Sequence, residues 1–265
     1  MTVENFESLS PSASSPVIPP RGSAPATVAT TGLLDNHIYG LNSRDQRSRP
    51  FNLLRSQVLK LARARGWRLI GVTSATPRVG KSFIASNLAA ALARTPEMHT
   101  YLFDLDLRRS SIAEYFNLEG DLGIANYLAG EIPDLRPVAR DVEGERLTIF
   151  PSFSNQLHSA ELVANARMEQ LIADMRRLPP DSFCICDLPP VFANDDAVVI
   201  SQKIDAYLLV VEEGVTTRKQ VRDTFQLLQP VPCLGTVLNR YHGGLMGDDY
   251  GYGYGQSQKY AEYYS

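Results

Sequence analysis

Six short runs of aliphatic, β-branched or aromatic residues alternate with segments of helical character, and this alternation most restricts what the chain can fold into. The runs are RLIGVTS, TYLFDLD, LTIFPS, FCICDLP, AYLLVVEEG and CLGTVLN. Strands separated by helices pair in parallel through right-handed crossovers, and the helices then cover both faces of the sheet. The sequence therefore predicts an α/β fold with a doubly wound, mostly parallel sheet that ends near Arg240.

The segment before the first of these runs is expected to be a helix. From Phe51 the sequence is FNLLRSQVLKLARARG, in which Leu54, Val58 and Leu61 recur at positions i, i+4 and i+7. This spacing places the three side chains on one helical face. A helix that packs by this face is therefore predicted to lead into the domain.

Composition divides the 265 residues into three parts. Residues 1–45 are dominated by Ser, Pro, Ala and Thr and offer few large apolar side chains, which predicts a disordered leader. Residues 46–240 contain the alternating strands and helices and form the predicted domain. In residues 241–265 Gly alternates with Tyr without strand or helix periodicity, which predicts a flexible tail.

Composition and charge also exclude several classes of protein. Hydrophobic residues at 44% and charged residues at 21% are typical of a globular chain rather than a fibrous or wholly disordered one. A formal net charge of -3 provides no broad basic field, so no nucleic-acid partner is expected. The absence of an apolar run of about 18 residues and of a signal peptide predicts a cytoplasmic chain. Cys184, Cys186 and Cys233 are too few for a disulfide framework and are expected in the core.

An octapeptide after the first strand has the spacing of a phosphate-binding P-loop. Residues 75–82 match the pattern G-x-x-x-x-G-K-[ST], with Ala75 in place of the first Gly. The loop amides and the following helix N-terminus would face phosphates, with Lys81 on the β and γ phosphates and Ser82 on Mg²⁺. A chance surface turn is the alternative, and the strand before and helix after favour the phosphate site. The residues expected to bind the nucleotide here are Thr76, Pro77, Arg78, Val79, Gly80, Lys81, Ser82 and Phe83.

Acidic residues end two further strands. Asp104 and Asp106 lie two residues apart, so both side chains leave one face of an extended chain at the carboxyl edge, where such sheets bind ligands. Capping of the next helix, or solvation of the edge, is the alternative. Asp187 ends another apolar run, as a Walker B carboxylate that holds Mg²⁺ through water requires. We expect these three carboxylates to serve metal binding or catalysis.

With these motifs the chain resembles the bacterial tyrosine kinases, the P-loop kinases that accompany capsular and exopolysaccharide assembly. The resemblance runs from Phe51 to the C-terminus. It rests on Pro77 within the P-loop, on LFDLDLR, which this family calls Walker A', on CDLPP followed by Asp196-Ala197, and on the C-terminal tyrosines. Chromosome- and septum-positioning ATPases of the same superfamily carry an additional lysine where this chain has Thr76, which argues against that branch.

The resemblance implies ATP and Mg²⁺ as cofactors and assigns roles to the motif residues. Lys81 and Ser82 would contact phosphates and metal, and Asp104 and Asp106 would lie near the transferred phosphoryl group and the metal. Asp187 would belong to the metal shell. By the same analogy Arg108 belongs to the Walker A' motif, and Asn239 would contact adenine. The alternative for Asn239 is a turn residue that ends a strand.

One motif departs from the family pattern. The helix before the P-loop strand commonly carries E-x-x-R-x-x-R, which joins subunits into a ring. The aligned residues here are Arg49, Asn52 and Arg55, of which the last matches. A homo-oligomer is still expected, but the ring, or the contact that holds it, differs from the family pattern.

The resemblance predicts a tyrosine autokinase that acts on its own tail, with Lys81, Asp104, Asp106 and Arg108 as catalytic residues. Six of the twelve tyrosines lie within residues 250–264 of this tail and are the expected acceptors. They are Tyr250, Tyr252, Tyr254, Tyr260, Tyr263 and Tyr264. The alternatives are an adhesive Gly/Tyr segment without chemistry and a nucleotide-dependent switch or scaffold without kinase activity.

The resemblance also implies partners and a location. The chain would regulate exopolysaccharide or capsule polymerisation and export together with a membrane co-polymerase supplied by a separate chain, and a cognate tyrosine phosphatase would oppose it. It would therefore be found at the inner face of the plasma membrane through that partner.

Overall fold

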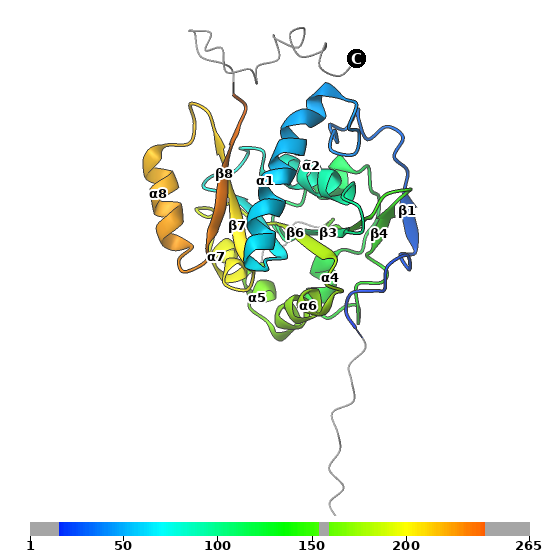
Figure 1. Cartoon of the computed structure of the whole chain (residues 1–265). Coiled ribbons are helices and arrows are strands. Elements are labelled where there is room, and N and C mark those ends of the chain that lie inside the picture. Colours follow the sequence, from blue (N-terminus) through cyan, green and yellow to red (C-terminus); the bar gives the residue numbers. More distant parts are fainter. Residues whose placement is uncertain (1–15, 154–158, 242–265) are drawn as a thin grey trace, which may run out of the picture.

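A mixed sheet of eight strands runs through the centre of the molecule (Figure 1). This computed structural model describes residues 16–153 and 159–241, and the strand order across the sheet is β1-β4-β5-β3-β6-β2-β7-β8. The strands are β1 (Ala26–Val28), β2 (Leu69–Ser74), β3 (His99–Asp104), β4 (Arg140–Val142), β5 (Leu147–Phe150), β6 (Ser182–Asp187), β7 (Ala206–Glu212) and β8 (Cys233–Asn239).

Every neighbouring pair of strands is parallel except β4 and β5, which are antiparallel. All six apolar runs of the sequence become strands, and they form the six-stranded parallel part from β5 to β8. This confirms the predicted fold class. The carboxyl ends of β2, β3 and β6 consequently meet at one edge of the sheet.

Helices cover both faces of this sheet. One side carries α1 (Arg49–Arg65), α2 (Lys81–Ala93) and α3 (Ile112–Tyr115), and the other carries α4 (Ile124–Leu128), α5 (Ser159–Val163), α6 (Ala166–Arg177), α7 (Asp196–Ser201) and α8 (Arg218–Leu227). A single 3-10 turn, Gln46–Ser48, precedes α1 among the described residues. No helix in residues 16–153 and 159–241 combines the length and hydropathy that crossing a bilayer requires.

Strand β6 illustrates how alternation along a strand builds the two cores. Ile185 belongs to the cluster under α1 and α2, whereas Cys184 and Cys186 belong to the cluster under α4 and α6. Both thiols are buried, as predicted from the sequence. Gly71 of β2 lies on the same face of the sheet as these thiols. A larger residue would clash there, because its Cβ would lie 2.6 Å from Cδ1 of Leu188.

Helix α1 forms where the sequence predicts it, but its apolar face is turned from the predicted one. Phe51, Val58 and Ala62 are buried against α2 and the sheet, and Leu54 packs at the margin of that core. Leu61, predicted on the buried face, is 39% exposed. At about 100° per residue, Phe51 and Ala62 lie to one side of Val58, within about 40°, whereas Leu61 lies about 60° to the other side. The buried line therefore runs through Phe51, Val58 and Ala62.

Residues 16–45 pack against the domain, which corrects the disordered leader expected there. Val17 and Ile18 are buried near α6, and the Val17 amide donates to Oδ2 of Asp174 at 2.5 Å. Strand β1 adds to the sheet by pairing with β4. Most of the few large apolar side chains of this segment are buried against the domain, Val28, Leu33 and Ile38 among them. Residues 1–15 of the predicted leader lie outside the described residues.

One side chain of α2 clamps this N-terminal segment. Oδ1 of Asn87 accepts hydrogen bonds from the amides of Tyr39 and Gly40, at 2.7 and 3.0 Å. Its Nδ2 donates to the carbonyls of His37 and Phe83, at 2.9 and 3.1 Å. The backbone at Gly40 lies so close to α2 that a Cβ would come 2.2 Å from the carbonyl oxygen of Asn87. The N-terminal segment is thereby attached to the helix that begins at the P-loop.

Substitution of Asn87 by Ala is expected to lower the free energy of unfolding by about 2–3 kcal/mol, because two amides near the core lose their acceptor. Urea unfolding followed by circular dichroism measures this change. Asn42→Ala is the matched control, since the Oδ1 of Asn42 accepts an exposed bond from the Arg44 amide and its loss should cost at most about 0.5 kcal/mol. Equal losses in the free energy of unfolding in the two variants would show that Asn87 does not hold the N-terminal segment on α2.

Candidate active site

The P-loop connects β2 to α2 at the carboxyl edge of the sheet. Gly80 has a φ of 91°, and a Cβ at this position would lie 2.2 Å from Nδ2 of Asn239. Only glycine accommodates both constraints without strain. Nδ2 of Asn239 donates to the carbonyl of Val79 at 2.8 Å, so the end of β8 supports the loop directly.

The segment after β6 packs along the same loop. The amides of Val191 and Phe192 donate to the carbonyls of Ser74 and Ala75, at 2.8 and 3.1 Å. Oγ1 of Thr73 donates to the Pro189 carbonyl at 2.7 Å. The two prolines of CDLPP end the strand so that the following residues turn against the P-loop. This contact sets the position of Asp187 relative to the loop.

Lys81, the first residue of α2, lies among polar groups from three elements. Its Nζ is 2.8 Å from Oδ2 of Asp106 and 3.3 Å from each carboxylate oxygen of Asp187. It also donates to Oγ of Ser82 at 3.0 Å. All four residues are buried. The structure therefore brings these predicted site residues together, while their catalytic and binding roles stay predictions.

Asp104 completes the cluster from the end of β3. It pairs with Asp187 in the register of β3 and β6, which places the two carboxyl groups on adjacent strand ends. Its Oδ2 accepts hydrogen bonds from the amides of Ser111 and Ile112, each at 3.2 Å. Its Oδ1 is buried and has no hydrogen-bond partner in the part of the chain that the structure describes. One oxygen of Asp104 thus remains open to a ligand.

The cluster carries more negative than positive charge. Burial disfavours the charge of Lys81, but Asp187 and Asp106 outweigh it and raise the pKa of this lysine above its ordinary value. Burial raises the pKa of Asp187 to about 6, against the lowering influence of Lys81. Burial and then the charge of Asp187 raise the pKa of Asp104 well above its ordinary value. One cation therefore faces three carboxyl groups, and a further cation would satisfy the site.

The donor set fits a magnesium ion that is shared with phosphate groups. Within the described residues, no three His, Cys, Asp or Glu side chains converge as a cage made of protein ligands alone would require. Magnesium is usually held by one or two carboxylates together with phosphate oxygens and water. The free oxygen of Asp104 and the hydroxyl of Ser82 beside Lys81 suit that shared arrangement.

The other predicted nucleotide-binding residues differ in exposure. Pro77 and Arg78 are exposed, Thr76 is half-buried, and Val79 is buried and contributes its carbonyl to Asn239. The ring of Phe83 packs inside an aromatic cluster. That cluster consists of Tyr39, Phe51, Phe83 and Tyr115, with ring centroids 5.5 to 6.3 Å from that of Phe83. Tyr39 comes from the segment predicted as disordered, so the sequence offered no signal for this contact.

Arg108 belongs to a second polar cluster beside the first. Its Nε donates to Oγ of Ser159 at 2.7 Å and lies 3.4 Å from Oδ2 of Asp196. The hydroxyl of Ser159 and Nδ2 of Asn194 also donate to that carboxylate, which is buried. The place of Asp196 after CDLPP marks it in the sequence, whereas no local pattern marks Ser159 and Asn194. The six tail tyrosines lie outside the described residues.

A P-loop between a parallel strand and a helix, with acidic residues ending the two neighbouring strands, defines the class of P-loop nucleotide-binding proteins. No protein-family model matches the chain. Its sequence is 32% identical to the putative tyrosine-protein kinase EpsB of Ralstonia nicotianae over 204 residues, which are 75% of this chain and 25% of that protein. It is 28% identical to the tyrosine-protein kinase CpsD of Streptococcus agalactiae, over 65% of this chain and 74% of that protein.

A solved structure gives the same result. The kinase domain of the Escherichia coli tyrosine kinase ETK matches with a TM-score of 0.68 and 26% identity, over 86% of this chain and 94% of that domain. In sequence and in fold the chain is thus similar to bacterial tyrosine kinases. It spans about a quarter of the length of EpsB, so it corresponds to one part of that relative.

Replacement of Asp104 by Asn is expected to stabilise the nucleotide-free protein at pH 8. An Asn oxygen keeps the bonds from the amides of Ser111 and Ile112, while one buried negative charge disappears. Because the folded-state pKa of Asp104 lies above its unfolded value, the penalty of the charge grows as the pH rises above about 3.9. We expect a gain in the free energy of unfolding of about 1 kcal/mol at pH 8 and a smaller gain at pH 5, by urea unfolding in EDTA.

Asp181→Asn is the matched control for this experiment. Hydrogen bonds from Arg21 lower the pKa of Asp181, so its charged form is favoured in the folded protein and the substitution should bring no gain at pH 8. A gain for Asp104→Asn that is as large at pH 5 as at pH 8 would contradict the proposed charge excess.

Proposed function

We propose that this chain is an ATP-dependent protein-tyrosine kinase that phosphorylates tyrosines of its own C-terminal segment. The observation that carries the proposal is the position of Lys81, whose Nζ lies 2.8 Å from Asp106 and 3.3 Å from Asp187 at the end of a P-loop. Its relatives EpsB and CpsD bear the name tyrosine-protein kinase, which supports the reaction type.

The proposed cofactors are ATP and Mg²⁺. The loop amides and the N-terminus of α2 would bind the phosphates, with Lys81 on the β and γ groups and Asn239 beside the adenine. Oxygens of Ser82, Asp104, Asp106 and Asp187 would hold the metal. When bound, the metal–nucleotide complex supplies the phosphoryl group and neutralises part of its charge.

The protein side chains would position the reactants and accept one proton. In the transfer, the phenol oxygen of a tyrosine bonds to the γ-phosphorus while the bond from that phosphorus to the departing ADP oxygen breaks. The phenol proton passes to a carboxylate, for which Asp104 and Asp106 are the candidates. The open Oδ1 of Asp104 and the raised pKa of this carboxyl group favour it as the proton acceptor. Arg108 would steady the segment that follows Asp106 through its contacts with Ser159 and Asp196.

The proposed acceptors are the six tyrosines of residues 250–264, phosphorylated in trans between subunits of a homo-oligomer. A segment of about 25 residues spans up to roughly 80 Å when extended, which is enough to reach a neighbouring subunit. Each phosphate adds about -1.5 to -2 charges, so a multiply phosphorylated segment would repel acidic surfaces. Phosphorylation would in this way loosen the assembly.

The proposed setting is exopolysaccharide or capsule polymerisation and export. A membrane co-polymerase on a separate chain would stimulate the kinase at the inner face of the plasma membrane, and a cognate tyrosine phosphatase would reverse the modification. This part of the proposal rests on the resemblance of the P-loop, LFDLDLR and CDLPP motifs to those of kinases in such systems.

A nucleotide-dependent switch or scaffold of the same assembly is the second candidate, and one observation favours it. Nη1 of Arg55 donates to the Ala91 carbonyl at 3.2 Å, and Oδ1 of Asn52 accepts a bond from Arg94 at 2.9 Å. Two of the three residues aligned with the assembly motif, Asn52 and Arg55, are thus engaged within their own chain. A kinase that depends on a ring held by that motif would need a different contact here.

Substitution of Lys81 by Met is expected to reduce tail phosphorylation by about a hundredfold or more, because the transferred phosphoryl group loses its cation. Mass spectrometry of the full chain after incubation with Mg·ATP measures the modification. Lys203→Met is the matched control, since Lys203 is paired with Glu169 away from the P-loop. If wild-type protein binds ATP but stays unmodified even with an activating co-polymerase tail, the result contradicts kinase activity and supports the nucleotide-dependent switch.

Transfer in trans is tested by mixing two inactive partners. One chain carries Lys81→Met with its tail intact, and the other carries Phe at all six tail tyrosines with Lys81 intact. We expect phosphate on the Lys81→Met chain in the mixture and on neither chain alone. Unmodified tails in the mixture, together with modified wild-type tails, would indicate transfer within one chain.

A further inference from the structure

Helix α1 is basic along its whole length and contains no acidic residue. Its five cationic residues are Arg49, Arg55, Lys60, Arg63 and Arg65. The chain as a whole has a formal net charge of -3, so the positive charge of this helix is opposite in sign to that of the whole chain. None of the five forms an ion pair with a described residue. The charge of this helix therefore remains available to a ligand.

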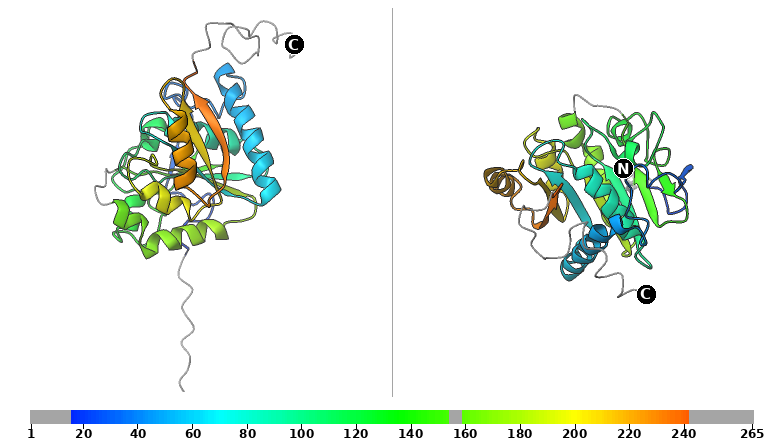
Figure 2. Two further views of the ribbon diagram at one scale, coloured as in Figure 1. Left: turned by 90° about the vertical axis from the view of Figure 1, so that its left-hand side faces the viewer. Right: turned by 90° about the horizontal axis from the view of Figure 1, so that it is seen from above.

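Helix α1 forms the outer layer on its side of the sheet, as the side and top views in Figure 2 show. Its outward residues combine charge with apolar surface: Leu53 is 46% and Leu61 is 39% exposed. We define the α1 face as Arg49, Leu53, Lys60, Leu61 and Arg63, all of which are exposed. A convex helix with cations around protruding leucines suits contact with a broad, flat and anionic surface.

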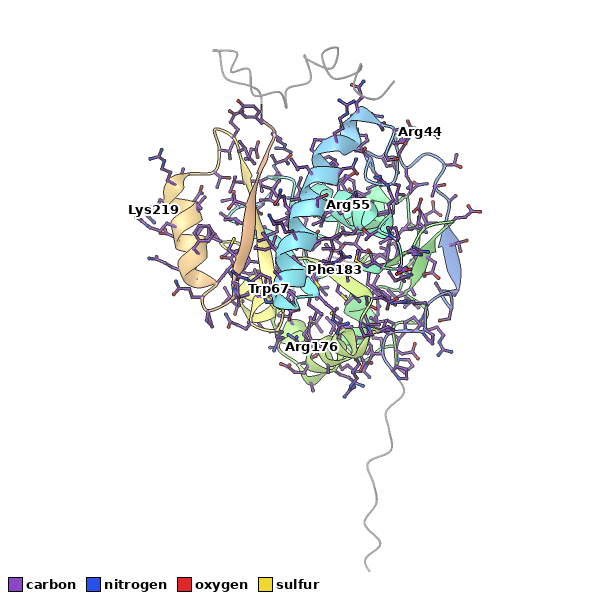
Figure 3. All side chains as sticks on the ribbon, in the orientation of Figure 1. Arg44, Arg55, Trp67, Arg176, Phe183 and Lys219 are labelled. Carbon is purple, nitrogen blue, oxygen red and sulfur yellow. The ribbon has the colours of Figure 1, made fainter. Side chains whose placement is uncertain are left out.

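A hollow of about 440 Å³ lies at the C-terminal end of the same helix. Arg63, Trp67 and Phe183 contribute to its lining, and Figure 3 shows Trp67 and Phe183 on the side of the molecule that α1 covers. The guanidinium of Arg65 stacks over the Trp67 ring at 4.7 Å. Tryptophan beside basic residues is typical of segments at membrane interfaces.

Two carboxylates also line the hollow. Asp181 is neutralised by a bidentate contact with Arg21, at 2.6 and 2.7 Å. Glu97 is therefore the acidic group that most offsets the charge of Arg63 there. The net charge at this end of α1 is therefore positive, because Arg63 and Arg65 together outweigh Glu97.

We propose that the α1 face, with the hollow beside Trp67, is a docking surface for a membrane that contains anionic phospholipids. Headgroup phosphates would meet Arg49, Lys60 and Arg63, and Leu53 and Leu61 would enter the interfacial region. In a symmetric pair of chains joined α1 to α1, the two basic helices would repel each other. A nucleic-acid backbone would bind the cations but would offer no apolar surface to Leu53 and Leu61. This contact does not depend on the proposed kinase activity.

Co-sedimentation of the full chain with vesicles tests the proposal. Vesicles of equal parts phosphatidylglycerol and phosphatidylcholine are compared with pure phosphatidylcholine vesicles. We expect binding to the anionic vesicles that weakens as salt is added. The variant with Arg49→Gln, Lys60→Gln and Arg63→Gln should bind about tenfold less or weaker still. Leu53→Ser with Leu61→Ser should lower the binding that persists at high salt.

Helix α8 provides a control with the same change of charge. The variant with Arg218→Gln, Lys219→Gln and Arg222→Gln also removes three exposed cations from one helix, and it should bind the anionic vesicles like the wild type. Unchanged circular dichroism and thermal unfolding confirm that each variant is folded. Equal binding to neutral vesicles, equal losses in the two triple variants, or no binding by the wild type would overturn the proposal.

Two further results would assign the α1 face to a different partner. Sedimentation velocity without vesicles would show self-association of the wild type that the α1 variant lacks, if the face joined two copies of the chain. Duplex DNA that bound the wild type and displaced it from vesicles would indicate a nucleic-acid surface. Either result would contradict a lipid-binding face.

Discussion

The ion cluster around Lys81 is the constraint on which the rest of the site depends. Parallel strands β3 and β6 end side by side, so their terminal carboxylates, Asp104 and Asp187, are forced into one buried region. Lys81 is the cation that makes this arrangement tolerable, with Asp106 at 2.8 Å as its nearest carboxylate. A buried charge without a partner is costly, so removing one member changes the protonation of the others.

The position of Lys81 depends in turn on contacts far from it in sequence. Helix α2 is held on one side by Asn87, which binds the backbone of residues 37–40, and on the other by the sheet. The P-loop before α2 is supported by Asn239 at the end of β8 and by the chain after β6. The N-terminal segment and β8 therefore both help to place the P-loop and Lys81, although neither belongs to the P-loop motif.

Most of the fold and the main cluster could be predicted, because their signals are local. Alternating apolar runs specify the parallel sheet, and residues 75–82, Asp104 and Asp187 are recognisable by spacing and by their place at strand ends. The packing of residues 16–45 could not be predicted, since Val17 and Ile18 find their partners only in the finished tertiary structure. The bond from Arg108 to Ser159 crosses 51 positions and leaves no local pattern for the same reason.

We propose that the excess negative charge around Lys81 makes this site a joint site for phosphate and metal. Isothermal titration of the full chain with ATP, in Mg²⁺ and in EDTA, tests it most directly. We expect tight binding only with Mg²⁺, because without the metal the carboxylates beside Lys81 repel the phosphates. Asp187→Asn should bring the two affinities closer together. Equal ATP affinity in Mg²⁺ and EDTA, unchanged in the Asp187→Asn variant, would contradict a joint site for phosphate and metal.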